Sequence, residues 1–448
     1  MTGWRLALSL VLFVVITGPF AALAPRPAPP PARCAGCNIV LVSIDTLRAD
    51  HVGAYGYGRP TTPTIDALAR RAVVFDDAIS QSAWTRPAHA SMLTGLYPSE
   101  HGMLAVKRYR KLAANVTTLP EVLARAGYET AAFTGGGNVS AHFGFDRGFS
   151  VYRDDGRRIE DHIAPISSWL DERSGEPFFL FVHGFDPHKP YKSRAQDRAA
   201  LGLAPTRAKS VARACRRGGG GGDVSPLVDE YDAAVHRGDR GLGRLLAMLE
   251  RRGRLERTVV VVTSDHGEEF LEHGGCYHIR TLYEEVVRVP LVIAVPGLAP
   301  RRVAGPVPAS VSIPRTLLEL VGIAGHGMPG PSLLERLSGA VNAEHGEQWV
   351  VSETEGRRTR SPRSGRVRAL RGDGEKLVYW LSTGLVEYFD LHGDPGETAP
   401  VESGTRRGRL ARRLTLWASE HRLHDRPEPA GPLPEAVRRR LRAHGYLN

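Results

Sequence analysis

The feature that most constrains the fold is a set of short, almost continuous apolar runs spread along the chain. They are NIVLVSID (residues 38–45), EPFFLFVHGFDPH (176–188), RTVVVVTSDHGEEF (257–270) and VPLVIAVPG (289–297). Such runs are typical of parallel strands buried on both faces of a sheet. Helical patterns separate them, for example TTPTIDALARRA (61–72) and TLPEVLARAG (118–127). This alternation predicts an α/β domain with a large, doubly wound, mostly parallel sheet flanked by helices.

The chain has 448 residues, which is too long for one ordinary core. We assign residues 38–340 to the large domain. Beyond residue 340 the pattern changes to WVVSETE, GRVRALRGDGEKLVYW and VEYFDLHGDPGET, which predict antiparallel strands and turns before basic helices. Residues 341–448 are therefore expected to form a small C-terminal α+β domain. Residues 193–226 are polar and Arg-rich with five glycines at 218–222, and they predict a flexible insertion.

The N-terminus predicts an exported protein. Residues Leu6 to Ala24 form an uninterrupted apolar stretch behind the short basic start MTGWR. Residues 1–24 fit a signal peptide and equally a single membrane anchor, so the protein is expected in the periplasm, secreted, or anchored facing outside the cytoplasm. Residues 25–37 form a Pro-rich linker. Four cysteines (Cys34, Cys37, Cys215 and Cys276) fit an oxidising compartment, and their pairing stays open, as does the oligomeric state.

The net charge of +11 comes from arginine, because only six of the 59 basic residues are lysine. This excess suits an anionic substrate, although a GC-rich genome explains it equally well. No nucleic-acid-binding module or basic motif interleaved with aromatic residues is present, so we expect no nucleic-acid partner.

Three of the apolar runs end in residues of the types that commonly coordinate metal ions. The residues are Asp45 after the first run, His183, Asp186 and His188 after the second, and Asp265 and His266 after the third. Ligands of open parallel sheets bind at the carboxyl ends of the strands, so these side chains are expected to converge. Carboxylate oxygens with an imidazole suit one divalent cation: Ca, Mg, Mn or Zn. A second metal at Asp186, His188 and His278 is the weaker alternative.

The stretch SAWTRPAHASMLTG (82–95) predicts a helix that begins near Thr85. Thr85 fits an N-cap, and it also fits a nucleophile at an anion-binding helix N-terminus. A metal held by Asp45, Asp265 and His266 would lower the pKa of the Thr85 hydroxyl. We expect Arg86 to grip an oxyanion, and His188 and His278 to contact the anion or protonate the leaving group.

Seven motifs occur along the chain in the same order as in a known protein family. They are IDTLRADHVGAYGY, TTPTIDALA, WTRPAHASMLTGLYPSEHG, FDPHKPY, SDHGEEFLEHG, LYEEVVRVPLVI and YFDLHGDPGET. From about residue 38 to 400 the chain resembles the sulfatase family of the alkaline-phosphatase-like superfamily. The resemblance implies a metal-dependent hydrolase of sulfate or phosphate esters of small molecules, glycans or lipids.

The resemblance also implies roles for single residues. Asp45, Asp265 and His266 would bind the metal together with Thr85, which takes the position of the nucleophile. His188 would contact the substrate anion, and His278 stands where many sulfatases have a lysine that touches the anion.

The departures from the family bear on the substrate. Typical sulfatases oxidise a Cys or Ser to formylglycine at the position of Thr85, where no formylglycine is expected. His89 replaces the arginine of that motif and is expected to bind substrate. The segment GGGNVS (135–140) lacks the usual Lys and His, and Asn138 is expected to substitute in part. An unmodified threonine resembles phosphodiesterases, phosphonate hydrolases and phosphoethanolamine-type transferases, which stay as alternatives beside a catalytically silent homologue.

Overall fold

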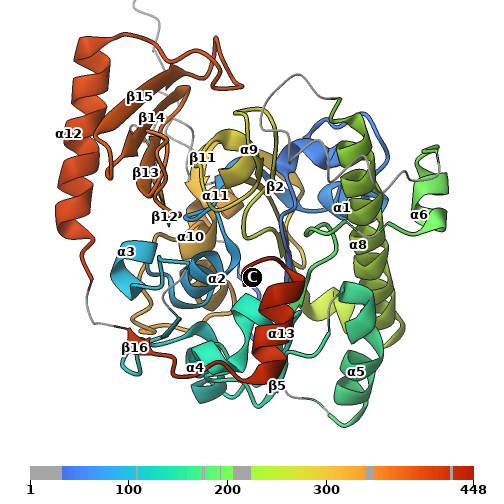
Figure 1. Cartoon of the computed structure of the whole chain (residues 1–448). Helices are drawn as coiled ribbons and strands as arrows, with labels where there is room; N and C mark the ends of the chain where they lie inside the picture. The colour runs from blue at the N-terminus through green and yellow to red at the C-terminus, as the bar shows by residue number, and fades with distance from the viewer. Residues whose placement is uncertain are drawn as a thin grey trace, which may run out of the picture.

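The structure is a computed structural model that describes residues 33–447 except 107–108, 157, 174, 176, 192, 205–222, 340–347 and 424–426. Its larger sheet has eight strands (Figure 1). In spatial order they are β11 (Arg301–Pro308), β2 (Val73–Ile79), β10 (Arg288–Ala294), β7 (Thr258–Thr263), β1 (Asn38–Ile44), β6 (Phe178–Gly184), β4 (Glu129–Phe133) and β5 (Val151–Arg153). Neighbouring strands are parallel except where β10 pairs with β2 and β7. The expected doubly wound, mostly parallel sheet is therefore confirmed.

Helices cover both faces of this sheet. Along β1, Ile39 and Leu41 pack into one apolar cluster, and Val40, Val42 and Ile44 pack into another. The first cluster contains residues of α2 (Thr85–Thr94), α4 (Leu119–Arg125) and α10 (Ala309–Leu320). The second contains residues of α1 (Pro63–Ala69), α5 (Ile159–Asp171) and α8 (Ser225–Arg251). Successive side chains of a strand point to opposite faces, so a strand buried on both faces reads as a continuous apolar run.

The smaller sheet is antiparallel and consists of β12 (Val350–Glu355), β13 (Arg366–Arg371), β14 (Glu375–Trp380) and β15 (Leu385–Asp390). The helix α12 (Gly404–Glu420) packs on it through Leu410 and Leu414. The last helix, α13 (Glu435–Ala443), instead lies beside α2 of the larger unit (Figure 1). Its Val437 and Leu441 share an apolar cluster with Ala90 and Leu93 of α2. The end of the chain thus returns to the large sheet and its helices.

The remaining elements are short. They are η1 (Ala49–His51), η2 (Gly53–Tyr55), α3 (Pro98–His101), β3 (Arg110–Lys111), η3 (Gly137–Val139), η4 (Ala141–Phe143), α6 (Ala195–Ala200), η5 (Leu255–Arg257), β8 (Glu269–Phe270), β9 (Cys276–Tyr277), α9 (Glu284–Val287), α11 (Leu334–Ser338) and β16 (Glu428–Pro429). The helix α6 and the start of α8 fall inside the stretch expected to be a flexible insertion, whose central residues 205–222 lie outside the described residues.

The expected signal or anchor, residues 1–24, lies outside the described residues, as does most of the Pro-rich linker. Within the described ranges, no helix combines the length and apolar character needed to cross a membrane. Cys34 and Cys37 form a disulfide, and Cys276 is disulfide-bonded as well.

Candidate active site

The candidate site lies at the carboxyl ends of three neighbouring strands. β1 is flanked by β6 and β7, and Ser43 is in register with both His183 and Thr263. Asp45 follows β1 and Asp265 follows β7 within two residues, so both carboxylates emerge at one edge of the sheet. The expected convergence of the strand ends is therefore present.

Three groups at this edge can hold one cation. One ligand atom from each of Asp45, Asp265 and His266 lies within 4.8 Å of the others, and all three residues are buried. Asp45 Oδ1 and Asp265 Oδ2 have no hydrogen-bond partner among the described residues. His266 Nδ1 donates to the Gly267 carbonyl at 2.9 Å, and its Nε2 lies 3.3 Å from Asp265 Oδ2. Buried acceptors that face one another need a positive charge between them, which fits a divalent metal.

The pKa values reflect the same crowding of charge. Burial raises the pKa of Asp45 well above its usual range, and the nearby carboxylates of Asp265 and Glu268 raise it further. Burial also opposes ionisation of Asp265, but the neighbouring His266 and His89 bring the pKa of Asp265 below its ordinary value. Without a cation, the two carboxyl groups are therefore not both stable as anions.

Thr85 is the first residue of α2 and is fully buried. The N-cap position belongs to Trp84, and no side chain caps the helix, so the N-cap role considered for Thr85 is not observed. The Thr85 hydroxyl oxygen lies 3.4 Å from Asp45 Oδ2 and 3.5 Å from His266 Nε2. It therefore adjoins the metal-type cluster at the positive end of a helix.

Arg86 is a buried cation in an aromatic cage. Its guanidinium carbon lies 4.1 Å from the ring centre of Phe143 and 5.2 Å from that of Tyr109. Nη2 donates to Asn138 Oδ1 at 2.8 Å, whereas Nε, Nη1 and Asn138 Nδ2 lack a partner in the described part of the chain. Burial lowers the pKa of Arg86 to about 10. Unpaired buried donors beside a cation suit an anionic ligand.

The two predicted anion-contact histidines lie side by side, with ring centres 5.1 Å apart. His188 Nδ1 donates to the Lys189 carbonyl at 2.6 Å, and the buried Nε2 has no partner among the described residues. His278 Nδ1 lies 2.7 Å from Glu268 Oε1. Burial lowers the pKa of both histidines well below the usual range, so both rings are neutral at pH 7 in this state.

His89 differs from its expected role as a substrate-binding residue. Its Nδ1 donates to the Thr85 carbonyl at 2.8 Å, and its Nε2 lies 3.0 Å from the Ser43 hydroxyl. Both ring nitrogens are thus used inside the protein, and the side chain is fully buried. In this geometry His89 holds the Thr85 carbonyl, and both of its ring nitrogens already have partners within the protein. Asp186 likewise binds Arg237 Nε at 3.1 Å and the Ile159 N–H at 3.0 Å, which opposes a second metal there.

Two further residues, His183 and Tyr446, contact the site. His183 Nδ1 accepts from the Gly135 N–H at 3.3 Å, so its Nε2–H points to Asp45 Oδ2 at 3.2 Å. His183 was expected among the possible metal ligands because it lies at the end of the second apolar run. In the structure it donates a hydrogen bond that orients Asp45. Tyr446 reaches the site from the far end of the chain, and its hydroxyl lies 3.1 Å from Thr85 Oγ1. No local signal in the sequence indicates that contact.

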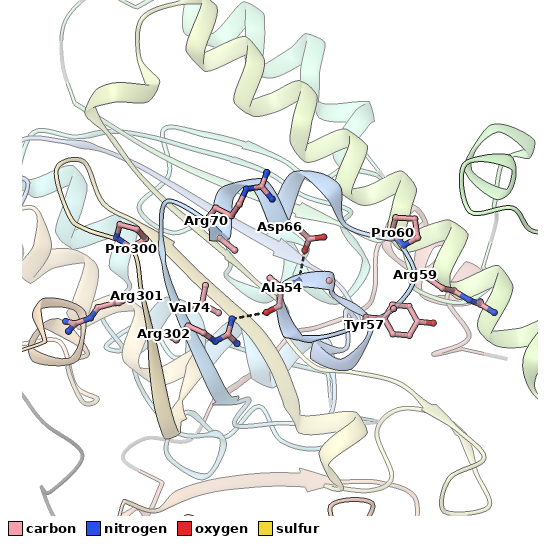
Figure 2. Close-up of a pocket in the computed structure, with 13 residues that line it drawn as sticks. Ala54, Tyr57, Arg59, Pro60, Asp66, Arg70, Val74, Pro300, Arg301 and Arg302 are labelled. Atoms are coloured by element: carbon pink, nitrogen blue, oxygen red, sulfur yellow. Dashed lines mark hydrogen bonds between the residues drawn. The ribbon is translucent and has the colours of Figure 1, made fainter.

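A separate surface pocket of about 700 Å³ shares no lining residue with this site (Figure 2). Arginines line it, but Arg59 already pairs with Asp229 at 2.7 Å and with Asp232 at 2.8 Å. Arg302 pairs with Asp76 and donates to the Ala54 carbonyl at 2.9 Å, as the dashed line in Figure 2 marks. Two of the arginines that line this pocket are thus paired with carboxylates, whereas Arg86 has no carboxylate partner among the described residues.

Comparisons with known proteins agree with the geometry. Residues 37–323 match the family model described as Sulfatase. Arylsulfatase K from Mus musculus is 25% identical over 88% of this chain and 81% of its own length. Delta 4,5-hexuronate-2-O-sulfatase from Bacteroides thetaiotaomicron is 24% identical over 80% of this chain and 83% of its own. The crystal structure of phosphonate monoester hydrolase from Agrobacterium radiobacter shares the fold, with a TM-score of 0.71 and 20% identity over 86% of this chain and 96% of that one.

The match to the family model covers more than half of the chain, and the solved structure has the same sheet-and-helix architecture. The chain belongs to the sulfatase family and is a hydrolase that acts on ester bonds.

Proposed function

We propose that the chain hydrolyses sulfate or phosphate esters through a covalent ester on Thr85, with one divalent cation in the site. The observation that carries the proposal is the position of the Thr85 hydroxyl. It lies at a helix N-terminus, 3.4 Å from Asp45 Oδ2 and 3.5 Å from His266 Nε2. A hydroxyl that adjoins both a cation site and a helix N-terminus is suited to attack an anionic ester.

Asp45, Asp265, His266 and Thr85 would hold the cation, which can be Ca, Mg, Mn or Zn. When bound, such a cation lowers the pKa of a hydroxyl and neutralises charge on an ester oxygen. The protein orients these ligands through neighbours. His183 donates to Asp45, and the Thr46 N–H donates to Asp265 Oδ1 at 3.2 Å. His89 holds the carbonyl of Thr85 and so fixes the start of α2.

Arg86 and Asn138 supply the donors for the ester's remaining oxygens. Their unpaired N–H groups are already desolvated, so a bound anion gains charge-assisted hydrogen bonds without expelling water from them. The negative charge of a bound ester favours the protonated form of His188, whose Nε2–H can then be donated to the leaving oxygen. Thr85 loses its hydroxyl proton to solvent, and its Oγ1 forms the new bond to sulfur or phosphorus as the bond to the leaving oxygen breaks. Water later cleaves the threonyl ester, which releases sulfate or phosphate and restores the hydroxyl.

Thr85 bears on the choice between sulfate and phosphate esters. Membership of the family and relatives named as sulfatases favour a sulfate ester of a glycan or small molecule. An unmodified threonine in place of an oxidisable Cys or Ser favours phosphodiester or phosphonate hydrolysis. The solved structure named as a phosphonate monoester hydrolase shares the fold of this chain, and that likeness is its only support for phosphonate hydrolysis here. We further propose that the protein is exported, on the apolar stretch Leu6 to Ala24 and the Cys34–Cys37 disulfide.

Turnover of four aryl substrates tests the proposal. The purified full chain would be assayed with p-nitrophenyl sulfate, p-nitrophenyl phosphate, bis(p-nitrophenyl) phosphate and p-nitrophenyl phenylphosphonate, each with Ca²⁺, Mg²⁺, Mn²⁺ or Zn²⁺. Thr85→Ala is expected to lower kcat about a thousandfold or more, because no nucleophile remains. Thr94→Ala, at the opposite end of α2, is the matched control and is expected to keep the wild-type kcat.

The pattern of substrates decides between the candidates. Turnover of phosphodiester or phosphonate that depends on Thr85 would favour phosphoester chemistry, and sulfate turnover that depends on Thr85 would favour the sulfatase. Turnover that survives Thr85→Ala would mean that the nucleophile is another group. No turnover, together with no stoichiometric divalent ion by elemental analysis, would indicate a catalytically silent homologue.

A further inference from the structure

The last described residues of the chain turn back onto the active site. After α13, the Gly445 N–H donates to the Arg442 carbonyl at 3.0 Å, and the Tyr446 N–H donates to the Leu441 carbonyl at 2.9 Å. Gly445 has a positive φ of 77°. This pair of bonds around a left-handed glycine is the Schellman ending of a helix, which gives the residue after the glycine a defined position. Tyr446 is therefore directed by the backbone.

The helix that carries this ending is fixed to the larger unit. Leu441 packs in the apolar cluster that includes Ala90 and Leu93 of α2. Arg440 Nη1 binds Asp154 Oδ1 at 3.1 Å. The ring of His444 stacks on Phe185, with ring centres 4.2 Å apart and an interplanar angle of 25°. Figure 1 shows α13 beside α2, with the end of the chain between the two helices.

Tyr446 Oη contacts two groups that the substrate anion would need. It lies 3.1 Å from Thr85 Oγ1 and 2.9 Å from His278 Nε2. An anion oxygen that touches both Thr85 Oγ1 and His278 Nε2 would have to lie where Tyr446 Oη lies, so the tyrosine hydroxyl and such an oxygen exclude each other.

The site is closed while the tail is in this position. Thr85 is 0% exposed, His188 is 3% exposed and His278 is 4% exposed. Tyr446, by contrast, is only half-buried, and its hydroxyl lies 3.1 Å from Thr85 Oγ1. An ester that is to be attacked by a fully buried hydroxyl needs the covering group to move.

We propose that residues 444–447, the C-terminal tail, are a removable cover of the active site and that Tyr446 is an internal competitor for the anion position. The inference rests on the proposed function, because it takes Thr85 and His278 as groups that meet the anion. Substrate binds only to the fraction of molecules whose tail has withdrawn, so the tail lowers the apparent affinity by that fraction. Esters that bind tightly enough to displace Tyr446 are admitted, which makes Tyr446 a specificity-determining residue.

Binding of inorganic phosphate and sulfate tests the inference without requiring turnover. Isothermal titration calorimetry in the presence of Mn²⁺ would compare the full chain with Tyr446→Phe and with a chain that ends at Ala443. Tyr446→Phe removes both hydrogen bonds of the hydroxyl and keeps the ring, so the phosphate Kd is expected to fall on the order of tenfold. The shortened chain is expected to gain at least as much. Tyr379→Phe, on β14 of the smaller sheet, is the matched control and should leave the Kd unchanged.

Hydrogen–deuterium exchange gives a second readout. Phosphate added to the wild-type chain should speed exchange at residues 444–447 while α13 stays protected. In assays of aryl esters, the variants should lower KM, and the effect should be larger for bulky leaving groups.

Two results would overturn the inference. Equal or weaker phosphate binding by Tyr446→Phe would show that Tyr446 does not compete, and a loss of kcat in that variant would mean that Tyr446 assists the reaction. In either case the proposed function stands if the wild type binds phosphate. If neither the wild type nor any variant binds phosphate or sulfate, the proposed function fails together with the inference. Thermal unfolding of each variant checks that the fold is intact.

Discussion

At the scale of single residues, the site contains buried polar groups that lack hydrogen-bond partners in the ligand-free protein. Asp45 Oδ1 and Asp265 Oδ2 are acceptors without a partner in the described ranges, and Arg86 Nε and Nη1 are donors without one. Each such group costs free energy in the empty protein, of the order of 1–3 kcal/mol. A bound metal ion would coordinate the unpaired acceptors, and a bound anion would accept hydrogen bonds from the unpaired donors. The free energy of unfolding should therefore depend strongly on both ligands.

The first prediction concerns Asp45→Asn. Burial and the nearby Asp265 raise the pKa of Asp45, so the carboxylate is unfavourable in the metal-free protein. The neutral amide is expected to leave the melting temperature of the metal-free protein unchanged or higher. It is also expected to abolish the rise in melting temperature that a divalent cation produces in the wild type. Differential scanning fluorimetry with and without each cation measures both effects, and a variant that keeps the full metal-induced rise would exclude Asp45 as a ligand.

The second prediction concerns Arg86→Met. Burial lowers the pKa of Arg86 to about 10, so keeping the side chain charged costs on the order of 3 kcal/mol. Methionine fills a similar volume in the cage of Phe143 and Tyr109 without that cost. We expect the variant to be at least as stable as the wild type and its Kd for phosphate to rise about a hundredfold. Urea unfolding and calorimetric titration measure the two quantities. A destabilised variant with unchanged phosphate binding would make Arg86 purely structural.

The sequence predicted the metal-type residues because strand ends carry their own signal. Asp45, Asp265 and His266 each follow a continuous apolar run, and parallel strands bring such positions to one edge. His89 was assigned to the substrate because sequence position cannot tell which way a helical side chain points. Tyr446 was missed because it is 361 residues from Thr85 and no periodic pattern links them.

At the scale of elements, the direction of a strand was harder to predict than its existence. The run VPLVIAVPG (289–297) correctly indicated β10, yet β10 pairs antiparallel with both neighbours. The connection from β7 to β10 contains only short elements: β8, β9 and the four-residue helix α9. A parallel return usually runs through a full crossover helix, which this connection lacks. The strand β11 was not predicted because its sequence, RRVAGPVP, contains Gly305, Pro306 and Pro308, which are uncommon inside strands.

The third prediction concerns the connection that leads to α9. His273 Nδ1 lies 2.9 Å from Glu285 Oε1, and its Nε2 lies 3.0 Å from the Glu397 carbonyl. Burial disfavours the charged ring, but Glu285 outweighs it and raises the pKa of His273 to about 9. A raised pKa stabilises the fold fully below the unfolded value of about 6.5, and the contribution is lost as pH rises through about 9.

We therefore expect the free energy of unfolding to fall by about 2 kcal/mol more in the wild type than in His273→Gln between pH 6 and pH 9.5. Urea unfolding at the two pH values measures the difference. The exposed His392→Gln should show the wild-type decline. An equal decline in His273→Gln would mean that His273 does not carry this pH dependence.

At the scale of the whole molecule, the two sheets are joined through buried polar contacts. The Ser82 hydroxyl donates to the Glu353 carbonyl at 2.9 Å, and the Ser352 hydroxyl donates to the Ser80 carbonyl at 2.5 Å. These contacts tie β12 of the smaller sheet to the segment that leads into α2 and Thr85. The smaller sheet thus supports the loop that leads to Thr85, and the two sheets are expected to unfold together.

Lys376 makes a further buried polar connection between the smaller sheet and the larger unit. It lies on β14, is fully buried, and its Nζ is 2.9 Å from Glu284 Oε1 of α9 and 2.9 Å from Glu397 Oε1. Burial raises the pKa of Glu397 to about 7, so this carboxylate depends on the lysine for its charge. Removing one member of a buried ion cluster leaves its partners uncompensated, at a cost of about 3–5 kcal/mol.

The last prediction follows from that cluster. The wild type is expected to unfold in one calorimetric transition, and Lys376→Met is expected to lower the temperature of that whole transition by several degrees because both sheets share the lost contact. Exposed Lys111→Met is the matched control and should leave it unchanged. A separate low-temperature transition in the wild type would mean that the smaller sheet unfolds on its own. In that case the loop before Thr85 would lose its support before the large sheet melts, and activity would disappear at the lower temperature.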